Sequence, residues 1–249
     1  MAAMKRTILL ALDTSTEFCS VALGVAPHRD ATAFSSVHVR HEATGSVSST
    51  RLLPAVGEVL DEAGVMLADC DAIAFGAGPG SFTGLRTATG AAQGLAFGAA
   101  RPVIPVSTLM ACAEAARTRD TGAACVLVAM DARMDEAYWA IYAWSDDDGD
   151  WRVVSAPALA RADAIVAPDT RFTLAGNAYA AFGARLGAAA QAASIDAEAL
   201  PHAASIASIA LRAWRRGAAI DPALAAPEYI RDKVAQTTAE REAARAEST

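Results

Sequence analysis

Four glycines stand close together in GAGPGSFTGLR, residues 76–86, directly after a short apolar run. Glycine-rich turns between a strand and a helix often bind phosphate through backbone N–H groups. This loop lacks the lysine of a P-loop, and Pro79 has no N–H group to donate. Two interpretations stay open from the pattern: an anion site, and a structural tight turn in which Gly80 or Ser81 caps the next helix.

Two aspartates stand at the ends of apolar runs. Asp13 follows TILLAL, residues 7–12, and Asp131 follows the run 124–130. Carboxylates at strand ends can hold Mg²⁺ through water, and they also cap turns by accepting backbone N–H groups. Both interpretations of this pair stay open from the sequence.

Other residues with metal-binding chemistry are scattered, and no metal site is predicted. His38 and His41 lack an obvious third ligand, so surface histidines are expected. The four cysteines stand far apart without a C-x-x-C motif, which favours buried, reduced thiols. The acidic segment SDDDGD, residues 145–150, lacks the ligand order of an EF-hand, so a solvated hairpin turn is expected rather than a calcium site.

Composition and charge limit the class of protein. The 249 residues are 53% hydrophobic and carry a net charge of −7, which is unlike a protein that grips nucleic acid alone through a basic face. No apolar run reaches the roughly 20 residues of a membrane span. The apolar run after Lys5 and Arg6 is too short for a secretory signal. A cytoplasmic protein with no membrane partner is predicted.

The elements that would position these residues are a mixture of strands and helices. Apolar runs predict strands at 7–12, 18–25, 32–40, 71–76, 102–107, 124–130, 135–144, 151–155 and 171–176. Helical spacing of apolar residues predicts helices at 49–64, 81–99, 108–117 and 203–217. Pro54 is expected in the first turn of its helix, and Gly64 at its end. Together these elements predict an α/β protein of two units, the first opening with an antiparallel meander.

A stripe of glycines follows one face of the predicted helix 81–99. Gly90, Gly94 and Gly98 recur every four residues and therefore share that face. Each glycine weakens a helix by about 1 kcal/mol relative to alanine, so the stripe indicates that another backbone approaches closely. That backbone belongs either to the protein's own sheet or to a second subunit.

Six segments together resemble one family. They run in order from about residue 8 to 235: ILLALDTSTEFCSVAL, LLPAVGEVLDEAG, GAGPGSFTGLRTATGAAQGLAFG, PVIPVSTLMACA, MDARMDEAYWAIY and APEYIRDKVA. In this combination they are similar to the bacterial TsaB (YeaZ) family, which is also labelled glycoprotease-like or M22-like. The connection HEATGSVSSTRL, between His41 and Leu52, is longer than is usual in that family.

The resemblance implies a fold and a function. The fold is α/β and actin/hexokinase-like (ASKHA), with two lobes that are each a mixed β-sheet flanked by helices. The first lobe would take residues 1–106 and about 205–249, and the second about 107–204. The chain would be a non-catalytic accessory subunit, inactive alone, in the synthesis of threonylcarbamoyladenosine on tRNA.

The same resemblance implies the partners. They are a TsaD-like transferase, a TsaE-like ATPase reached through the complex, a second copy of the chain, and tRNA held indirectly. Transferase relatives carry V-N-H-L-E-G-H where this chain has VSTLMAC, so Thr108 and Cys112 replace two metal-binding histidines. The hairpin from Asp13 to Ser20 also lacks the glycine of ATP-using relatives. No cofactor is expected to bind this chain tightly, and ATP or ADP and a metal are expected in the partner complex.

Site residues follow from the same resemblance. Helix 81–99 would meet a partner through Thr83, Gly84, Thr87, Gly90, Ala91, Gly94 and Gly98. A cleft with a vestigial nucleotide site would be formed by Asp13, Thr14, Ser15, Gly78, Gly80, Ser81, Arg86, Asp131 and Arg133. Among these, Arg86 would form a polar cluster with Asp131 and Arg133. A third group, Arg212, Arg215 and Arg216, would either help to hold tRNA or form a solvated helix face.

Two other functions of the same fold stay open as alternatives. An M22-like peptidase needs a metal site, and a weak ATPase needs firm nucleotide binding. The two histidines and the hairpin glycine named above are the groups that each would require and that this sequence lacks.

Overall fold

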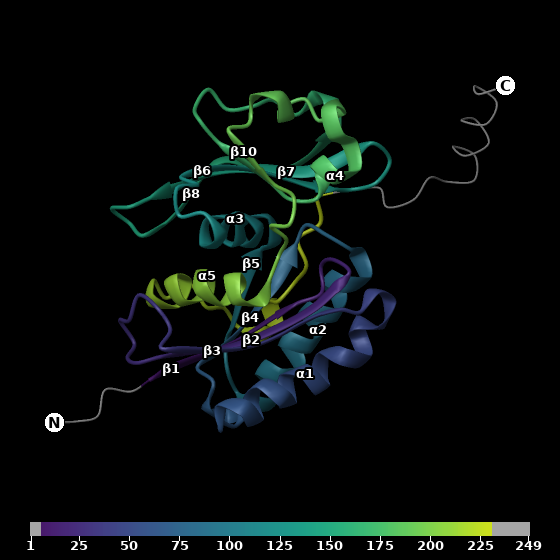
Figure 1. The fold of residues 1–249 in the computed structure, drawn as a ribbon. Coiled ribbons are helices and arrows are strands. Elements are labelled where there is room, and N and C mark those ends of the chain that lie inside the picture. Colours follow the sequence, from purple (N-terminus) through teal and green to yellow (C-terminus); the bar gives the residue numbers. More distant parts are fainter. Residues whose placement is uncertain (1–5, 231–249) are drawn as a thin grey trace.

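The computed structural model describes residues 6–230, which form two five-stranded sheets. The strand order is β3-β2-β1-β4-β5 in the first sheet and β10-β9-β6-β7-β8 in the second. Both sheets are mixed: β1 pairs antiparallel with β2 and parallel with β4, and β6 pairs antiparallel with β7 and parallel with β9. The predicted fold class, α/β with two mixed sheets flanked by helices, is confirmed (Figure 1).

The first sheet is covered by helices on both faces. Its strands are β1 Thr7–Asp13, β2 Phe18–Ala26, β3 Ser36–Ala43, β4 Ala72–Gly78 and β5 Val103–Ser107. Its helices are α1 Ser48–Ala63, α2 Phe82–Ala99 and α5 Ala203–Arg215. Ile8, Leu10 and Leu12 of β1 pack toward α1 and α2, whereas Leu9 and Ala11 pack toward α5. Burial on both faces explains why β1 is a continuous apolar run.

The second sheet is covered by one long helix and a set of short elements. Its strands are β6 Cys125–Asp131, β7 Glu136–Ser145, β8 Asp150–Arg161, β9 Thr173–Ala175 and β10 Ser194–Asp196. Helix α3, Thr108–Arg119, covers one face through Val126, Val128 and Tyr142. The other face packs against α4, Ala178–Phe182, and the turns that follow it.

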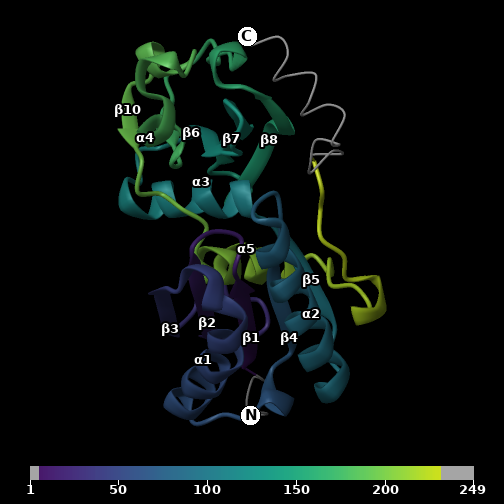
Figure 2. The ribbon, with the colours of Figure 1, turned by 90° about the vertical axis from the view of Figure 1, so that its right-hand side faces the viewer.

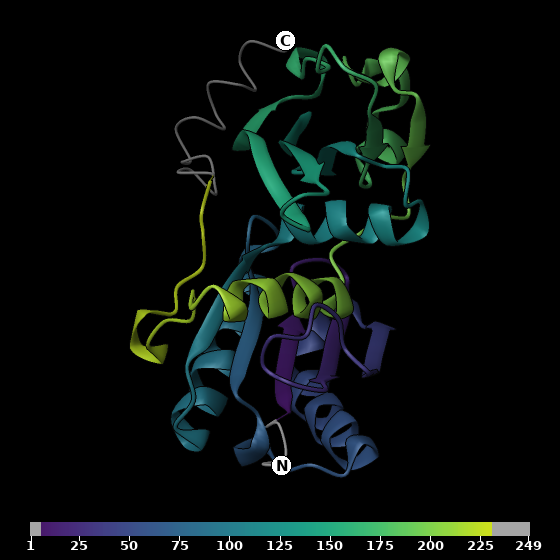
Figure 3. The ribbon, with the colours of Figure 1, turned by 90° about the vertical axis from the view of Figure 1, so that its left-hand side faces the viewer.

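The two halves meet through helices. From bottom to top, Figure 1 shows α1 and α2, the first sheet, α5, α3 and the second sheet, and α3 contacts α5 directly. Figure 3 shows the same pair of helices from the side, lying between the sheets. After α5 the chain returns along the first sheet, where Ile220 forms an antiparallel bridge with Val103. In Figure 2 this last segment runs beside α2 and β5 toward the second half.

Several predicted boundaries differ from the structure. Strand β3 begins at Ser36 rather than at 32, because residues 28–35 form a turn in which Ser35 N–H donates to the Val25 carbonyl. The placement of Pro54 was wrong: α1 begins at Ser48, so Pro54 lies inside the helix. Gly64 ends α1 as predicted, with a φ of 65°. Within residues 6–230, no helix is both long and apolar enough to cross a bilayer. The lobe boundaries stay a prediction.

Candidate functional site

A cleft of about 600 Å³ opens between the two halves, at the ends of β1, β4 and β6. Ligands of open α/β sheets commonly bind at such strand ends. The lining is rich in hydroxyl groups, and its charged members are Glu17, Asp131 and Arg133. The other lining residues are Thr14, Ser15, Thr16, Gly45, Ser46, Ser48, Ser49, Pro79, Gly80, Ser81, Thr83, Gly84, Thr87, Met130, Ala132, Tyr138, Asn177 and Pro201.

The glycine-rich loop packs tightly against neighbouring backbone. A Cβ atom on Gly78 would lie 2.5 Å from the Glu228 carbonyl oxygen, and one on Gly80 would lie 2.7 Å from that of Ser15. Ser81 N–H donates to the same Ser15 oxygen at 2.8 Å, so it is not directed at the cleft. Ser81 also caps α2 by accepting from Gly84 N–H. This geometry favours the tight-turn interpretation of the loop.

Gly84 belongs to the cleft floor and not to the outward glycine stripe. A Cβ atom there would lie 1.8 Å from the Thr14 carbonyl oxygen, which only a glycine permits without a backbone shift. The Thr14 hydroxyl in turn donates to the Gly84 carbonyl at 2.6 Å. The first turn of α2 is therefore held directly on the hairpin between β1 and β2.

Asp13 lies beneath the cleft and not on its lining. Its side chain is 0% exposed, and Oδ2 accepts from the Ser15 N–H and hydroxyl groups at 3.2 and 2.9 Å. The other oxygen, Oδ1, has no hydrogen-bond partner among residues 6–230 and lies against Gly76. Burial raises the pKa of Asp13 to about 6, although both hydrogen bonds from Ser15 oppose the shift. In this structure Asp13 caps the turn after β1.

Asp131 and Arg133 reach the cleft from a bend in the second sheet. Asp131 accepts from Arg133 N–H at 2.8 Å, and its own N–H donates to Asn177 Oδ1 at 2.8 Å. Arg133, Met134 and Asp135 all have left-handed φ angles, of 66°, 56° and 59°. Such conformations are unfavourable for residues with a side chain and are concentrated at functional sites. The bend holds the Arg133 side chain, which is 86% exposed, at the cleft.

Arg86 lies outside the cleft lining, apart from the polar cluster in which the sequence placed it. Its guanidinium lies 4.0 Å from the centroid of Phe82, and its Nε donates to the Tyr229 hydroxyl at 2.9 Å. Tyr229 also stacks on Phe82 at 5.3 Å, and Glu228 N–H donates to the Ala77 carbonyl at 2.7 Å. Arg86 thus fastens the C-terminal segment to the start of α2.

The glycine stripe of α2 faces outward. Gly90, Gly94 and Gly98 are exposed, and a Cβ atom on each would have no neighbour within 4 Å in the part of the chain that the structure describes. The alternative in which the stripe packs on the protein's own sheet is therefore wrong. Ala91, which the sequence assigned to the same interface, packs partly against the core of the first sheet. Thr83 and Thr87 lie at the cleft end of the helix.

The two positions compared with metal-binding histidines are part of the packed interior. Thr108 is fully buried and donates to the Pro79 carbonyl at 2.5 Å. Cys112 is fully buried and donates to the Ala199 carbonyl at 2.6 Å, and burial raises the pKa of its thiol far above the usual range. Across residues 6–230, no three His, Cys, Asp or Glu side chains gather into a set that could hold a metal ion.

The arginines proposed for tRNA have a different environment from the one expected. Arg212 is 12% exposed and is bonded to Glu114 and Asp150, and Arg216 is paired with Asp150. Arg212 is therefore not part of a solvated face, whereas Arg215 and Arg216 are exposed, and a contact with tRNA stays a prediction. The acidic turn is exposed at Asp146, Asp147 and Asp148, as expected, but Asp150 is only 16% exposed.

His41 and His202 line a second, smaller pocket of about 350 Å³. His41 stacks between Phe18 and His202, with ring centroids 4.5 and 4.2 Å away. His202 caps α5 by accepting from Ala204 N–H, and burial lowers its pKa to about 4. His38 lies on the surface beside Glu62 at 3.1 Å.

Sequence reasoning missed one wall of the cleft. Gly45 and Ser46 precede α1, and Ser48 and Ser49 begin it; all four line this wall and belong to the segment 41–52 that is longer than usual. That extra length was the available signal. Asn177 was also missed, because it follows β9, 46 residues away from its partner Asp131.

Comparisons with known proteins agree with this structure. The family model described as TsaD, tRNA N6-adenosine threonylcarbamoyltransferase, matches residues 42–242. The tRNA threonylcarbamoyladenosine biosynthesis protein TsaB of Escherichia coli is 48% identical over 143 residues, which are 57% of this chain and 58% of that one. The Haemophilus influenzae protein of the same name is 48% identical over 136 residues, 55% and 54% of the two chains. These matches therefore span little more than half the length of either relative.

A solved structure matches over a longer stretch. The structure of YeaZ from Pseudomonas aeruginosa superimposes with a TM-score of 0.79 at 39% identity, covering 90% of this chain and 99% of that one. The superposition therefore extends over both sheets and the cleft between them. Together with the TsaD model match, it shows that the chain belongs to the TsaB (YeaZ) family of TsaD-related proteins.

Proposed function

We propose that this chain is an accessory subunit in the synthesis of threonylcarbamoyladenosine on tRNA, and that it pairs with a TsaD-like transferase. Support comes from its E. coli and H. influenzae relatives, both of which are tRNA threonylcarbamoyladenosine biosynthesis proteins. The interior packing of Thr108 and Cys112 supports a role other than metal-dependent catalysis. A TsaE-like ATPase would join through the transferase, and tRNA would be held mainly by the partners.

The observation that carries the proposal is the outward stripe of Gly90, Gly94 and Gly98. Each glycine weakens α2 by about 1 kcal/mol relative to alanine, and nothing within residues 6–230 requires the absence of a side chain there. Close approach of a helix from another subunit would require it. Phe97, 57% exposed on the same helix, adds apolar area to that surface. A second copy of the chain would use the same face when the transferase is absent.

In this proposal the cleft binds a ligand only together with the partner subunit, and this chain catalyses no reaction there by itself. Its hydroxyl-rich lining suits a polar ligand, but the Ser81 N–H group is already bonded to Ser15. Nucleotide and metal would be held chiefly by the partner. Arg133, held at the cleft by the left-handed bend, is the cation that this chain would contribute.

The test is the mass in solution, by light scattering, of this chain alone and mixed with the TsaD-like protein of the same organism. We expect a homodimer that gives way to a mixed complex. Gly94→Leu should weaken both associations at least tenfold while the circular dichroism spectrum is unchanged. Ala180→Leu, at an exposed position of α4 in the other half, is the matched control. Failure to associate at micromolar concentration, with or without nucleotide, would remove the main support for the proposal.

Nucleotide binding by the chain alone separates the accessory role from an ATPase. A ligand present at 100 times its dissociation constant stabilises a protein by about 2.7 kcal/mol, which raises the melting temperature by several degrees. We expect Mg-ATP to shift the melting temperature of the isolated chain by less than about one degree. A shift of several degrees, together with hydrolysis, would favour the ATPase alternative.

A further inference from the structure

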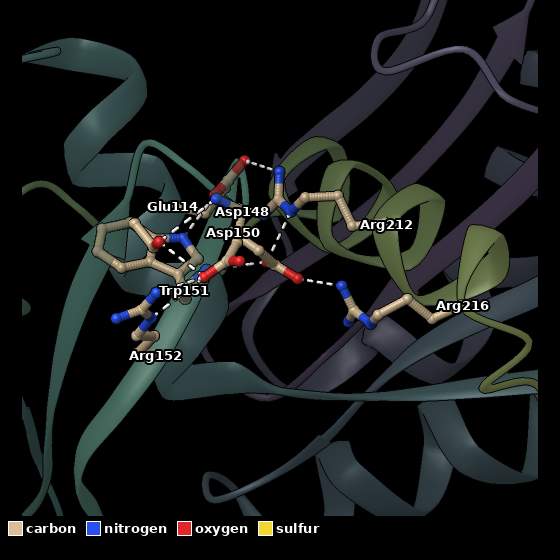
Figure 4. Close-up of polar contacts among 8 residues, drawn as sticks. Glu114, Asp148, Asp150, Trp151, Arg152, Arg212 and Arg216 are labelled. Carbon is tan, nitrogen blue, oxygen red and sulfur yellow. Dashed lines mark hydrogen bonds and ion pairs between the residues drawn. The ribbon is translucent and has the colours of Figure 1, made fainter.

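A cluster of charged side chains joins α3, α5 and β8 (Figure 4). Arg212 of α5 donates from both terminal nitrogens to Glu114 of α3, at 3.0 and 2.8 Å. Its Nε donates to Oδ1 of Asp150, the first residue of β8, at 2.8 Å. Arg216 pairs with the other oxygen of Asp150, and the indole of Trp151 donates to Glu114 at 2.6 Å.

The central charges of this cluster are largely removed from water. The exposed fractions of Arg212, Glu114 and Asp150 are 12%, 11% and 16%. The attraction within a buried ion pair offsets the cost of removing the charges from water only where the geometry is good and the remaining hydrogen-bonding groups are satisfied. Both conditions hold here, because the Arg212 fork meets Glu114 in the two-pronged arrangement and each carboxylate oxygen has a partner.

The cluster joins the two halves of the molecule. Helix α5 packs on Leu9 and Ala11 of the first sheet, whereas α3 packs on Val126 and Val128 of the second, to which β8 also belongs. The chain itself crosses between the halves at two places. One crossing is at Ser107–Thr108, where Thr108 bonds to the cleft residue Pro79, and the other is next to Pro201, which lines the cleft.

The crossings and the cluster therefore lie at different ends of α5. His202 caps the beginning of this helix, so at about 1.5 Å per residue Arg212 lies about 15 Å further along it and Arg216 about 21 Å. With both crossings at one end, rotation of one half against the other would be opposed there only by the packing of α3 on α5. A third attachment at the far end of the helix would oppose that rotation further.

We propose that Glu114, Arg212, Asp150 and Arg216 form an interlobe lock, which fixes the orientation of the two halves and so sets the width of the cleft. The lock is a conformational device separate from partner binding, because its residues lie on α3, α5 and β8 and not on the outward face of α2. A partner or ligand would then meet a cleft of preset width, without a closing motion.

The lock can be tested by measuring a distance between the halves in the full chain. The four native cysteines are buried, so spin labels can be directed to Leu53→Cys on α1 and Val166→Cys beyond β8, which are 55% and 72% exposed. Pulsed EPR then gives the distribution of distances between the two labels. For the unaltered lock we expect one narrow distribution.

The variant that opens the lock should leave no buried charge without a partner. Glu114→Gln combined with Arg212→Met removes the ion pair, while the amide oxygen of Gln can still accept from Trp151. We expect this pair of substitutions to make the distance distribution about twice as wide or to shift its mean, while circular dichroism shows both sheets folded. The matched control is Arg152→Met, which removes a surface pair with Asp148 on the same hairpin; the two side chains are 66% and 57% exposed. It should leave the distribution unchanged.

A folded double variant with the original narrow distribution would overturn the proposal. If the double variant does not fold, Asp150→Asn, which weakens both arginine contacts, is scored by the same criterion. If both fail to fold while Arg152→Met folds, the proposal is also wrong. In that case the cluster is needed for folding itself and is not a lock between halves that fold without it.

Discussion

Asp13 is a carboxyl group that uses only half of its capacity to accept hydrogen bonds. Oδ2 accepts two bonds from Ser15, whereas Oδ1 has no partner and faces Gly76 in the interior. A buried charge of this kind is unfavourable, and this is why burial raises the pKa of the group to about 6. At neutral pH the ionised Asp13 carboxylate beneath the cleft therefore lowers the stability of the folded chain.

The substitution Asp13→Asn should remove a pH dependence of stability. The pKa of Asp13 in the folded state, about 6, lies above its ordinary value of 3.8, so the stability from the protonated form is fully present below pH 4 and is lost as pH rises through 6. This loss amounts to roughly 3 kcal/mol. Asparagine stays neutral and can still accept from Ser15. Urea unfolding at pH 4.5 and pH 7 should show a smaller fall in the free energy of unfolding for the variant than for the original chain.

Asp148→Asn provides a control of opposite sign. Its hydrogen bond with Arg152 lowers the pKa of Asp148, so its contribution to stability is lost as pH falls, not as it rises. An Asp13→Asn variant with the original pH slope would mean that Asp13 is no harder to ionise in the folded chain than in the unfolded one.

Helix α2 shows that glycines of one helix can have opposite effects. At Gly84 a side chain would collide with the Thr14 carbonyl oxygen, whereas at Gly94 it would meet open space. The first glycine is needed by the fold, because it lets the helix rest on the hairpin after β1. The second weakens the helix of the isolated chain, which is why we propose that another subunit contacts this face.

Alanine at these two positions should change stability in opposite directions. Gly94→Ala should raise the free energy of unfolding by up to about 1 kcal/mol, because alanine favours a helix. Gly84→Ala should lower it by about 1 to 3 kcal/mol, because the collision with Thr14 forces a backbone shift. Urea denaturation of the three proteins measures both changes. A Gly94→Ala variant less stable than the original would show that the stripe already packs against something within this chain.

The elements could be predicted from sequence to the extent that they are local. The apolar runs at 7–12 and 71–76 became β1 and β4 within one or two residues, because burial on both faces leaves a continuous apolar signal. The short strand β10 was missed because a strand of three residues, exposed at Ser194 and Ile195, carries no such pattern. Strand β8 was drawn too short because its second half, up to Arg161, consists largely of alanines with no alternation.

Contacts between distant residues could not be predicted in the same way. Arg86 was placed in the cleft by its neighbours in sequence, but its partner Tyr229 is 143 residues away. Asp150 looked like part of a solvated turn because Arg212, its partner, is 62 residues away. The glycine loop and the cleft hydroxyls were found because one local motif carries most of them. For the wall formed by Gly45, Ser46, Ser48 and Ser49, the sequence offered only one signal, which was the unusual length of the segment 41–52.

At the scale of the whole molecule, the two halves are held together by side-chain contacts as well as by the two chain crossings. Helices α3 and α5 lie against each other between the sheets, and the charged cluster fastens the far end of that contact. Each half has a core of its own on both faces of its sheet. The charged side chains between the halves are largely buried, so removing one of them would leave another without its partner and lower the stability.

Removing one partner from the interlobe lock should be costly. Arg212→Ala leaves Glu114 without its bidentate partner in a buried site, and such losses amount to about 3 to 5 kcal/mol. Arg152→Ala, which removes an exposed pair, should cost less than about 1 kcal/mol. Thermal unfolding followed by circular dichroism compares the two variants. A loss below 1 kcal/mol for Arg212→Ala would indicate that water fills the site and solvates Glu114.

The position of α5 in the chain also affects how the protein is made. One face of the first sheet is covered only when α5 arrives, and Ala203, at its start, lies 183 residues after its hydrogen-bond partner Ser20. At about 5 to 20 residues per second, a ribosome needs roughly 10 to 40 s to synthesise that interval. During this time Leu9, Ala11 and their neighbours present an uncovered apolar surface on the nascent chain. This face of the N-terminal half therefore stays open to other contacts until α5 has been synthesised.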